Sequence, residues 1–280
     1  MSYRIISLLL ALICITPGLL SAKGRKVSKI VLDAGHGGRD GGARGQFSNE
    51  KDLTLAVALR VGKLMADSMK DVEVVYTRTS DVYPTLVERH EIANRSNADL
   101  FISIHVNATA GRTERYKAGT RRVKKGKKYV TVPVYKTVHH KETTTSGTET
   151  YVLGLHRSYQ KEDAIGEYGD SITEEPGLLN ENDPQTAIII SQYTQAFLGR
   201  SVSLAGKIQE QFAAQGRRDL GVKQKGLEVL AGSAMPGVLI EIGFINNPSE
   251  EAYLNSESGQ QEVAMAIFKG IQAYKWDAER

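Results

Sequence analysis

The stretch VLDAGHGGRDGGARGQFSNEKDLTLAVALRV, residues 31–61, joins an apolar run, a histidine among glycines and a glutamate before a periodic segment. The apolar run belongs to SKIVLDAG (28–35), which predicts a buried strand ending at a glycine. Beyond Glu50, the residues Leu53, Val57 and Val61 recur at helical spacing and predict a helix to about Met69. His36 therefore follows a strand directly, and Glu50 opens the next helix.

The segments that follow repeat this alternation. VEVVYTR (72–78) predicts a second strand, LVERHEIANRS (86–96) a helix, and DLFISIHVNA (99–108) a third strand that is apolar up to His105. GTETYVLG (147–154) and GVLIEIGFINN (237–247) predict later strands, with helices at about 185–214 and 260–274. Strands that are nearly continuous in apolar residues and alternate with helices favour one α/β domain with a parallel sheet covered on both faces.

Residues 1–22 have the layout of a secretory signal peptide, because Arg4 precedes an apolar run that is broken by Pro17 and followed by Ser21 and Ala22. A retained membrane anchor is the competing interpretation. We expect export to the periplasm or cell envelope and no membrane span after cleavage. Cys14 is the only cysteine and lies in this leader, so a metal site in the mature chain would need His, Asp and Glu. We find no nucleotide-binding loop and no nucleic-acid module.

Residues 111–146 interrupt the α/β pattern with a basic insertion. Eleven lysines and arginines and one acid lie between Arg112 and Lys141. KKYVTVPVYKTV (127–138) alternates well enough to predict an exposed hairpin. Such a charge run is most often a solvated face, and binding of a polyanion is the second interpretation.

Residues capable of metal or acid–base chemistry lie at or near the predicted strand ends: His36, His105 and Glu241. Ligands of open α/β sheets bind beyond the carboxyl ends of the strands, and the first loop could return Glu50 to the same rim. Two imidazoles and a carboxylate can form a catalytic zinc site with a position left for water. Each histidine could instead be a hydrogen-bonded structural residue, and Glu50 could complement a helix dipole. Glu241 is harder to explain structurally, because burying a carboxylate in an apolar strand is costly.

Four blocks in order resemble the zinc-dependent N-acetylmuramoyl-L-alanine amidases of the amidase type 3 family. They are IVLDAGHGGRDGGARG, NEKDLTLAVALRV, VVYTRTSDVYPTLVERHEIANRSNADLFISIHVNA and PGVLIEIGFINNPSEEAYL. The likeness covers about 29–108 and 147–274 apart from the insertions, and it places the catalytic domain at 28–276. It implies a single domain built on a twisted, mostly parallel sheet of about six strands, flanked by helices on both faces.

The resemblance also implies roles for residues of this chain. His36, Glu50 and His105 would hold one Zn²⁺, and Glu241 would be the catalytic acid–base. The substrate would be the peptidoglycan amide between N-acetylmuramic acid and L-alanine, and Asn107 would contact the substrate or support the site. We expect a monomer. A zinc peptidase that cuts within the stem peptide and a non-catalytic wall-binding protein are the alternatives.

Residues 155–200 resemble the regulatory insertion of amidases that act in daughter-cell separation. In those relatives an inserted helix covers the zinc until an activator protein withdraws it. Glu167 in AIGEYGDSI is the residue that we expect to block the metal, with Glu174, Glu175 and Glu181 as competitors.

Overall fold

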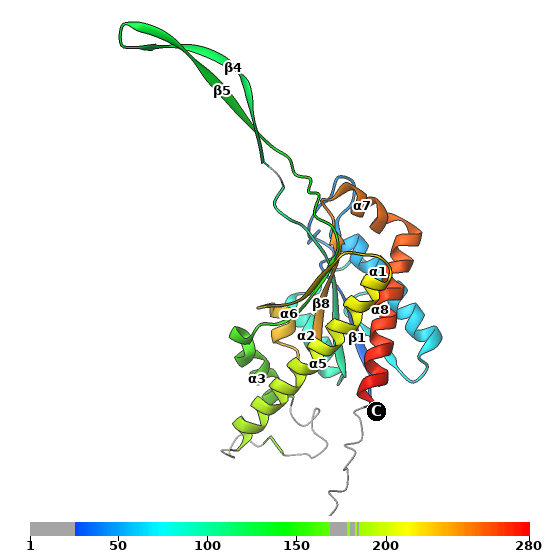
Figure 1. The fold of residues 1–280 in the computed structure, drawn as a ribbon. Helices are drawn as coiled ribbons and strands as arrows, with labels where there is room; N and C mark the ends of the chain where they lie inside the picture. The colour runs from blue at the N-terminus through cyan, green and yellow to red at the C-terminus, as the bar shows by residue number, and fades with distance from the viewer. Residues whose placement is uncertain (1–25, 112, 169–177, 180–182, 184) are drawn as a thin grey trace, which may run out of the picture.

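The computed structural model describes residues 26–111, 113–168, 178–179, 183 and 185–280, so the predicted leader lies outside the described residues (Figure 1). A six-stranded sheet of order β2-β1-β3-β8-β6-β7 forms its centre. The strands are β1 (Lys29–Ala34), β2 (Glu73–Tyr76), β3 (Leu100–Asn107), β6 (Thr148–Leu153), β7 (Asp219–Lys225) and β8 (Gly237–Phe244).

The direction of the strands decides where chemistry can occur. β2, β1, β3 and β8 are mutually parallel, so their carboxyl ends share one edge of the sheet, the carboxyl rim. β6 pairs antiparallel with β8, and β7 runs parallel to β6. The predicted α/β fold with a mostly parallel six-stranded sheet is confirmed. The reversal of β6 sends the chain that follows it to the opposite rim.

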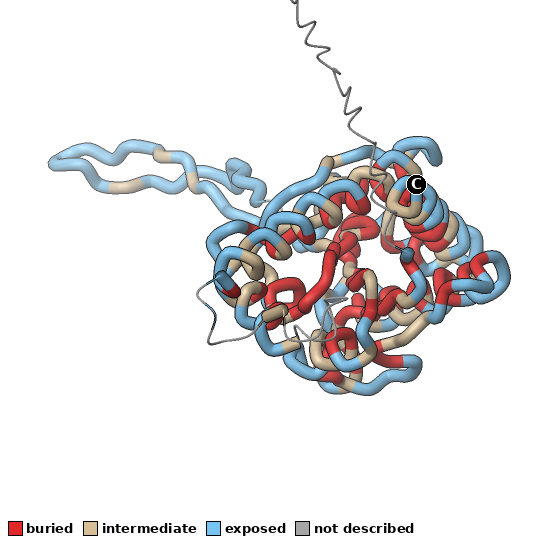
Figure 2. The backbone as a smooth tube through the Cα atoms, turned by 90° about the horizontal axis from the view of Figure 1, so that it is seen from below, coloured by how far each residue is buried: buried red, intermediate tan, exposed pale blue. Residues whose placement is uncertain are grey.

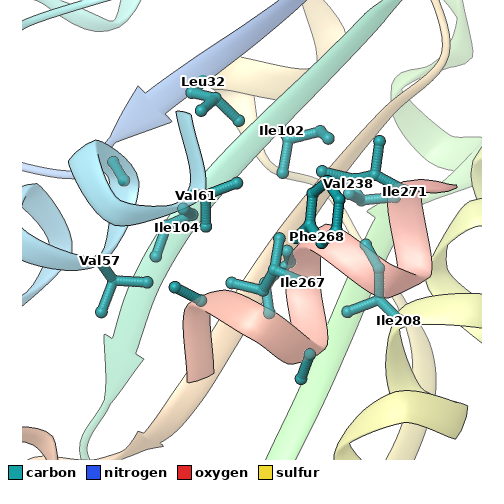
Figure 3. Packing of buried hydrophobic residues seen from close by; sticks show 14 of the residues in the cluster. Leu32, Val57, Val61, Ile102, Ile104, Ile208, Val238, Ile267, Phe268 and Ile271 are labelled. Atoms are coloured by element: carbon teal, nitrogen blue, oxygen red, sulfur yellow. The ribbon is translucent and has the colours of Figure 1, made fainter. Parts of the chain in front are cut away.

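The three long helices α1 (Glu50–Ser68), α5 (Thr186–Ala214) and α8 (Glu257–Ala278) cover one face of the sheet (Figure 1). They build the larger core, in which side chains of α1 and α8 meet those of β1, β3 and β8 (Figure 3). Its members include Leu32, Val57, Val61, Ile102, Ile104, Ile208, Val238, Ile267, Phe268 and Ile271. β-Branched and leucine side chains on alternate strand positions explain why this face is closed to water.

Shorter helices cover the second face: α2 (Leu86–Arg95), α3 (Ser158–Glu167), which follows the 3₁₀ turn Leu155–Arg157, and α6 (Glu228–Ala231). A smaller core joins α2 and α6 to the sheet through Val31, Phe101 and Leu239, whereas Ala164 and Ile165 of α3 pack in a third cluster with Phe197 of α5 and Ala234. α7 (Pro248–Asn255) follows β8 directly, at the carboxyl rim.

The basic insertion forms a two-stranded ribbon of β4 (Thr113–Lys125) and β5 (Lys128–His139). It extends away from the domain, starting from the carboxyl rim, and nearly all of its residues are exposed (Figures 1 and 2). An exposed hairpin is present, but the prediction placed it wrongly: nearly all of residues 127–138 lies in the single strand β5, and the hairpin forms because this strand pairs with residues 113–125, which the alternation did not cover.

The two ends of the described domain are fastened to one another. The Val27 N–H donates to Glu279 Oε1 at 2.8 Å, and Lys275 Nζ donates to the Val27 carbonyl at 3.1 Å. This junction precedes β1, so it lies at the end of the sheet opposite the carboxyl rim (Figure 1). Across the described parts of the chain, none of the helices has the length and apolar character needed to span a bilayer.

Candidate metal centre

The loop that carries His36 is tightly folded. His36 has a φ of +59°, and Gly37 and Gly38 that follow it have φ values of +128° and +53°. This left-handed region suits glycine, and a histidine there is uncommon. Hydrogen bonds between the main chains of Gly37 and Asp40, at 2.9 and 3.0 Å, close the turn. The turn directs the imidazole of His36 toward the rim.

Two glycines make room for the side chains that meet at this rim. A Cβ on Gly35 would lie 2.4 Å from Cε1 of His105. A Cβ on Gly42 would lie 2.6 Å from Oε2 of Glu50 and 2.7 Å from Cδ2 of His36. The glycines of this motif therefore serve the side chains of the centre as well as the turn of the backbone.

His36, Glu50 and His105 form one group, in which a ligand atom of each lies within 4.8 Å of the others. Glu50 Oε2 lies 3.2 Å from His36 Nε2, and Glu50 Oε1 lies 2.9 Å from His105 Nδ1. The three residues come from the loop after β1, the first turn of α1 and β3. The structure brings together the three residues that the sequence predicted as metal ligands.

Neighbouring groups fix the orientation of these side chains. Asp40 Oδ2 lies 2.8 Å from His36 Nδ1, which leaves Nε2 directed at Glu50. Glu50 is almost fully buried and accepts hydrogen bonds from the N–H groups of Val106 (2.9 Å) and Ala43 (2.8 Å). Carboxylates that orient a ligating histidine in this way are typical of metal sites.

The charges of the group are strongly coupled. Burial lowers the pKa of His36, but the Glu50 and Asp40 carboxylates outweigh it and raise that pKa to about 9. Burial raises the pKa of Glu50, but its hydrogen bonds and charge interactions with His105 and His36 lower it further than burial raises it. The Glu50 carboxylate is thus ionised, and a cation can take the place of the proton that it favours on His36. Two imidazoles and one carboxylate are a donor set that suits zinc.

A buried ion pair lies beneath the metal group and contacts the backbone of the His36 loop. Asp33 is fully buried in β1, and its Oδ1 lies 2.6 Å from Nη1 of Arg89 on α2. Asp33 also accepts from the hydroxyls of Thr77 (2.7 Å) and Ser103 (2.6 Å). Arg89 donates from Nη2 to the His36 carbonyl at 2.7 Å. Asp33 and Arg89 are not among the predicted site residues, although an aspartate inside an apolar strand is a sequence signal for such a pair.

Glu241 lies on β8 opposite His105, its register partner on β3. Burial raises the pKa of the Glu241 carboxyl to about 7, and the carboxylates of Glu50 and Glu149 act in the same direction. His105 and Lys225 oppose that shift. Among the described residues, no partner donates a hydrogen bond to its buried Oε2. A carboxyl with a pKa near neutrality is suited to accept and return a proton.

A polar cluster continues from Glu241 across β6 and β7. Asn107 donates from Nδ2 to Glu149 Oε1 at 2.6 Å, and Tyr151 donates to the same oxygen at 2.7 Å. Lys223 pairs with the other oxygen of Glu149. Asn107 thus positions Glu149, which is the register partner of Glu241. Glu149 and Lys223 were not predicted, because the alternation in TETYVL does not reveal which face is open.

Glu167 lies elsewhere. It is the last residue of α3, is exposed, and is not part of the metal group. α3 is fixed on the second face by the buried Lys161, whose ammonium donates to the carbonyls of Leu230 (3.1 Å) and Ser233 (2.7 Å). Because β6 runs antiparallel to β8, α3 begins at the rim opposite the metal group (Figure 1). Glu174, Glu175 and Glu181 lie outside the described residues.

The model of one protein family, described as N-acetylmuramoyl-L-alanine amidase, matches residues 30–273. The chain belongs to this family. It is therefore an amidase that acts on peptidoglycan, and the relation that the sequence motifs implied is confirmed.

The chain is similar to individual proteins and solved structures. The amidase is 31% identical over 249 residues to N-acetylmuramoyl-L-alanine amidase AmiC of Escherichia coli O6:H1, covering 88% of this chain and 52% of that protein. It is 30% identical over 277 residues to the uncharacterized protein YqiI of Bacillus subtilis, with 98% of both chains covered. The N-acetylmuramoyl-L-alanine amidase of Clostridium difficile 630 has a similar structure, with a TM-score of 0.58, 28% identity and coverage of 89% of this chain and 97% of that one. The CwlD amidase of Clostridioides difficile, solved in complex with the GerS lipoprotein, matches with a TM-score of 0.57 and 25% identity, over 88% and 98% of the two chains.

Proposed function

We propose that this amidase is a zinc enzyme in which His36, Glu50 and His105 hold the ion and Glu241 is the catalytic acid–base. The observation that carries the proposal is the convergence of two imidazoles on one buried carboxylate, with Glu241 on the neighbouring strand. A zinc ion held there would polarise the amide carbonyl and lower the pKa of a water.

The residues of the chain supply the remaining steps. The Glu241 carboxylate takes a proton from the attacking water and returns one to the nitrogen of L-alanine as the bond to the lactyl carbonyl breaks. The proton return is needed because an amide anion is a very poor leaving group. Asp40 keeps His36 in the tautomer that presents Nε2 to the ion. Asn107 acts on this reaction through Glu149, as a positioning residue.

We further propose that the protein is exported, with residues 1–22 removed as a leader and 28–276 forming the catalytic domain, and that it remodels the wall during daughter-cell separation. Cell-wall amidases among its relatives support an extracytoplasmic location. Amino-terminal sequencing of the protein from the envelope tests the leader. Growth in unseparated chains after gene deletion, rescued by the wild type but not by Glu241→Gln, tests the cellular role.

The regulatory role of residues 155–200 and of Glu167 stays a prediction. Deletion of 155–184 is expected to raise basal activity if this segment restrains the enzyme. A folded deletion variant no more active than the parent would count against it.

The deciding experiment is dye release from labelled sacculi by the mature protein with zinc, with chelator and with Glu241→Gln. We expect release that requires both zinc and Glu241. Mass analysis should show intact stem peptides with a free L-alanine amine, whereas fragments cut within the stem would identify a peptidase instead.

A further inference from the structure

The ribbon of β4 and β5 carries a charge that the rest of the chain does not share. Residues 113–139 contain nine lysines and arginines and one acid, so the ribbon contributes +8 to a chain whose net charge is +4. The remainder of the chain is therefore net negative, at −4. Glu114, the single acid of the ribbon, lies with its Oε2 3.3 Å from Nε2 of His140. The positive charge of the ribbon is thus largely uncompensated by the ribbon itself.

The strand register divides these cations between the two faces. Residues paired across the strands share a face, and alternate residues along a strand share it too. One face carries Arg115, Lys117, Arg122 and Lys124, and the other carries Arg121, Lys125, Lys128 and Lys136, with Lys127 in the turn. Arg115 and Lys117, and likewise Arg122 and Lys124, are two residues apart on one strand face and so about 7 Å apart, and Lys125 lies directly opposite Lys128. These separations are less than the Debye length of about 8 Å at physiological ionic strength, so the potentials add within each of these pairs.

The apolar and aromatic residues of the ribbon are used in pairs that hold it together. Val123 lies directly opposite Val130 on one face. On the other face, the guanidinium of Arg115 stacks 4.5 Å from the Tyr135 ring centre, and Arg122 stacks 5.3 Å from that of Tyr129. Cross-strand pairs of this kind stabilise a two-stranded ribbon that has no core of its own.

The base of the ribbon is fixed beside the metal centre. Asn246, in the turn after β8, donates from Nδ2 to the carbonyls of Thr109 (2.8 Å) and Lys141 (2.9 Å), one on each leg of the ribbon. The same β8 carries Glu241, and β3, which leads into the ribbon, carries His105. At about 3.3 Å per residue, the paired strands extend roughly 40 Å from this rim.

From this arrangement we infer that the ribbon is an arm that binds the carboxylates of peptidoglycan strands around the scissile bond. Cations on both faces suit a three-dimensional anionic mesh, whereas a planar anionic membrane would meet only one face. The free carboxylates of stem peptides supply such a mesh. The choice of peptidoglycan as the polyanion rests on the proposed function, but binding can be measured without catalysis.

The test measures binding to purified sacculi in the presence of chelator, with Glu241→Gln as the parent protein so that no substrate is cut. One variant adds Lys→Gln at positions 124, 125, 127 and 128. A matched control adds Lys→Gln at the exposed positions 26, 63, 70 and 269. We expect the ribbon variant to bind about tenfold more weakly or worse, and the control to bind like the parent.

Two further ligands identify the anion that the ribbon binds. A second variant tests whether weaker binding results from misfolding. Sacculi whose carboxylates are amidated should lose most of the binding of the parent, and vesicles of anionic phospholipid should bind it less well than sacculi do. A chain with 113–139 replaced by a short linker should bind sacculi as weakly as the ribbon variant, with its thermal unfolding unchanged. Equal binding by the ribbon and control variants, undiminished binding to amidated sacculi, or preference for vesicles would overturn the inference. Dye release by the wild-type protein tests the amidase proposal separately.

Discussion

The loop between β1 and α1 and the β4–β5 ribbon both start from the carboxyl rim, yet different forces hold them in place. Residues 35–49 are folded against neighbouring side chains and backbone, so that four glycines there, Gly35, Gly37, Gly42 and Gly45, have no space for a methyl group. The ribbon pairs only with itself, and its two glycines, Gly119 and Gly126, have nothing within 4 Å of an added Cβ. Geometry is specified by tertiary packing at the proposed metal centre, and by local pairing in the ribbon.

Of all the changes considered, we expect the largest effect from a substitution beside the packed β1–α1 loop, and this effect is on catalysis. Glu241→Gln keeps the shape of the side chain but removes the acid–base, so we expect the rate of amide cleavage to fall by about 10²–10⁴-fold. Zinc content, measured on the purified variant, should equal that of the wild type. A variant that loses its zinc would show that Glu241 contributes to metal binding.

Stability of the rim should depend on Asp33. Asp33→Asn leaves the buried Arg89 without its charge partner, and we expect about 3–5 kcal/mol less free energy of unfolding. Burial raises the pKa of Asp33, but Arg89 and the hydrogen bonds from Ser103 and Thr77 bring it below the ordinary value of 3.8. The stabilisation is therefore complete above about pH 4 and is lost as the pH falls through the lower folded value. Urea titrations at pH 7 and pH 3 should show a smaller difference between variant and wild type at the lower pH.

A comparison of two glycines that share a positive φ can distinguish the effect of side-chain packing on metal binding from the effect of backbone strain. Gly42 and Gly126 both have a φ of +65°, but only Gly42 has atoms of Glu50 and His36 in the way of a Cβ. Gly42→Ala is expected to weaken zinc binding by about 10–100-fold, as disturbed support of metal ligands commonly does. Gly126→Ala carries the same backbone strain and should leave zinc affinity unchanged. Competition with a chelating dye measures both, and equal losses would mean that the contact with the ligands is unimportant.

The smallest effect is expected on the ribbon side. Replacing 113–139 by a short linker removes no residue of either core of the sheet, so the free energy of unfolding should change by less than about 0.5 kcal/mol. Denaturant unfolding followed by circular dichroism measures it, because the long helices α1, α5 and α8 lie outside the ribbon. A substantially larger loss would show that the ribbon contributes to the folding of the domain.

The sequence predicted those parts of the fold and site for which a single physical cause explains the residues present. Apolar runs defined β1, β3 and β8; His36 follows β1, His105 lies near the end of β3, and Glu50 opens the helix α1. β7 was not predicted, because most of its residues are exposed and polar and nothing in its composition requires a strand.

Strand direction was the other limit. The motif around β6 does not show that this strand runs against β8, and that reversal determines both the partner of Glu241 and the position of α3. Glu149 belongs to the site because β6 pairs with β8, and Lys223 because β7 pairs with β6, tertiary facts that periodicity along one segment does not contain.

The hydrogen bonds between Val27 and the carboxyl-terminal end of the chain fix which end of the domain the amino terminus lies at. Val27, next to the first described residue, lies at the end of the sheet opposite the metal centre. If the leader were not cleaved and stayed in a bilayer, the proposed metal centre would therefore face away from the lipid. The length of the sheet would separate it from the membrane surface. Such an anchor would also limit the distance from the membrane at which the enzyme could cleave peptidoglycan. Cleavage of the leader would remove this limit without altering the reaction.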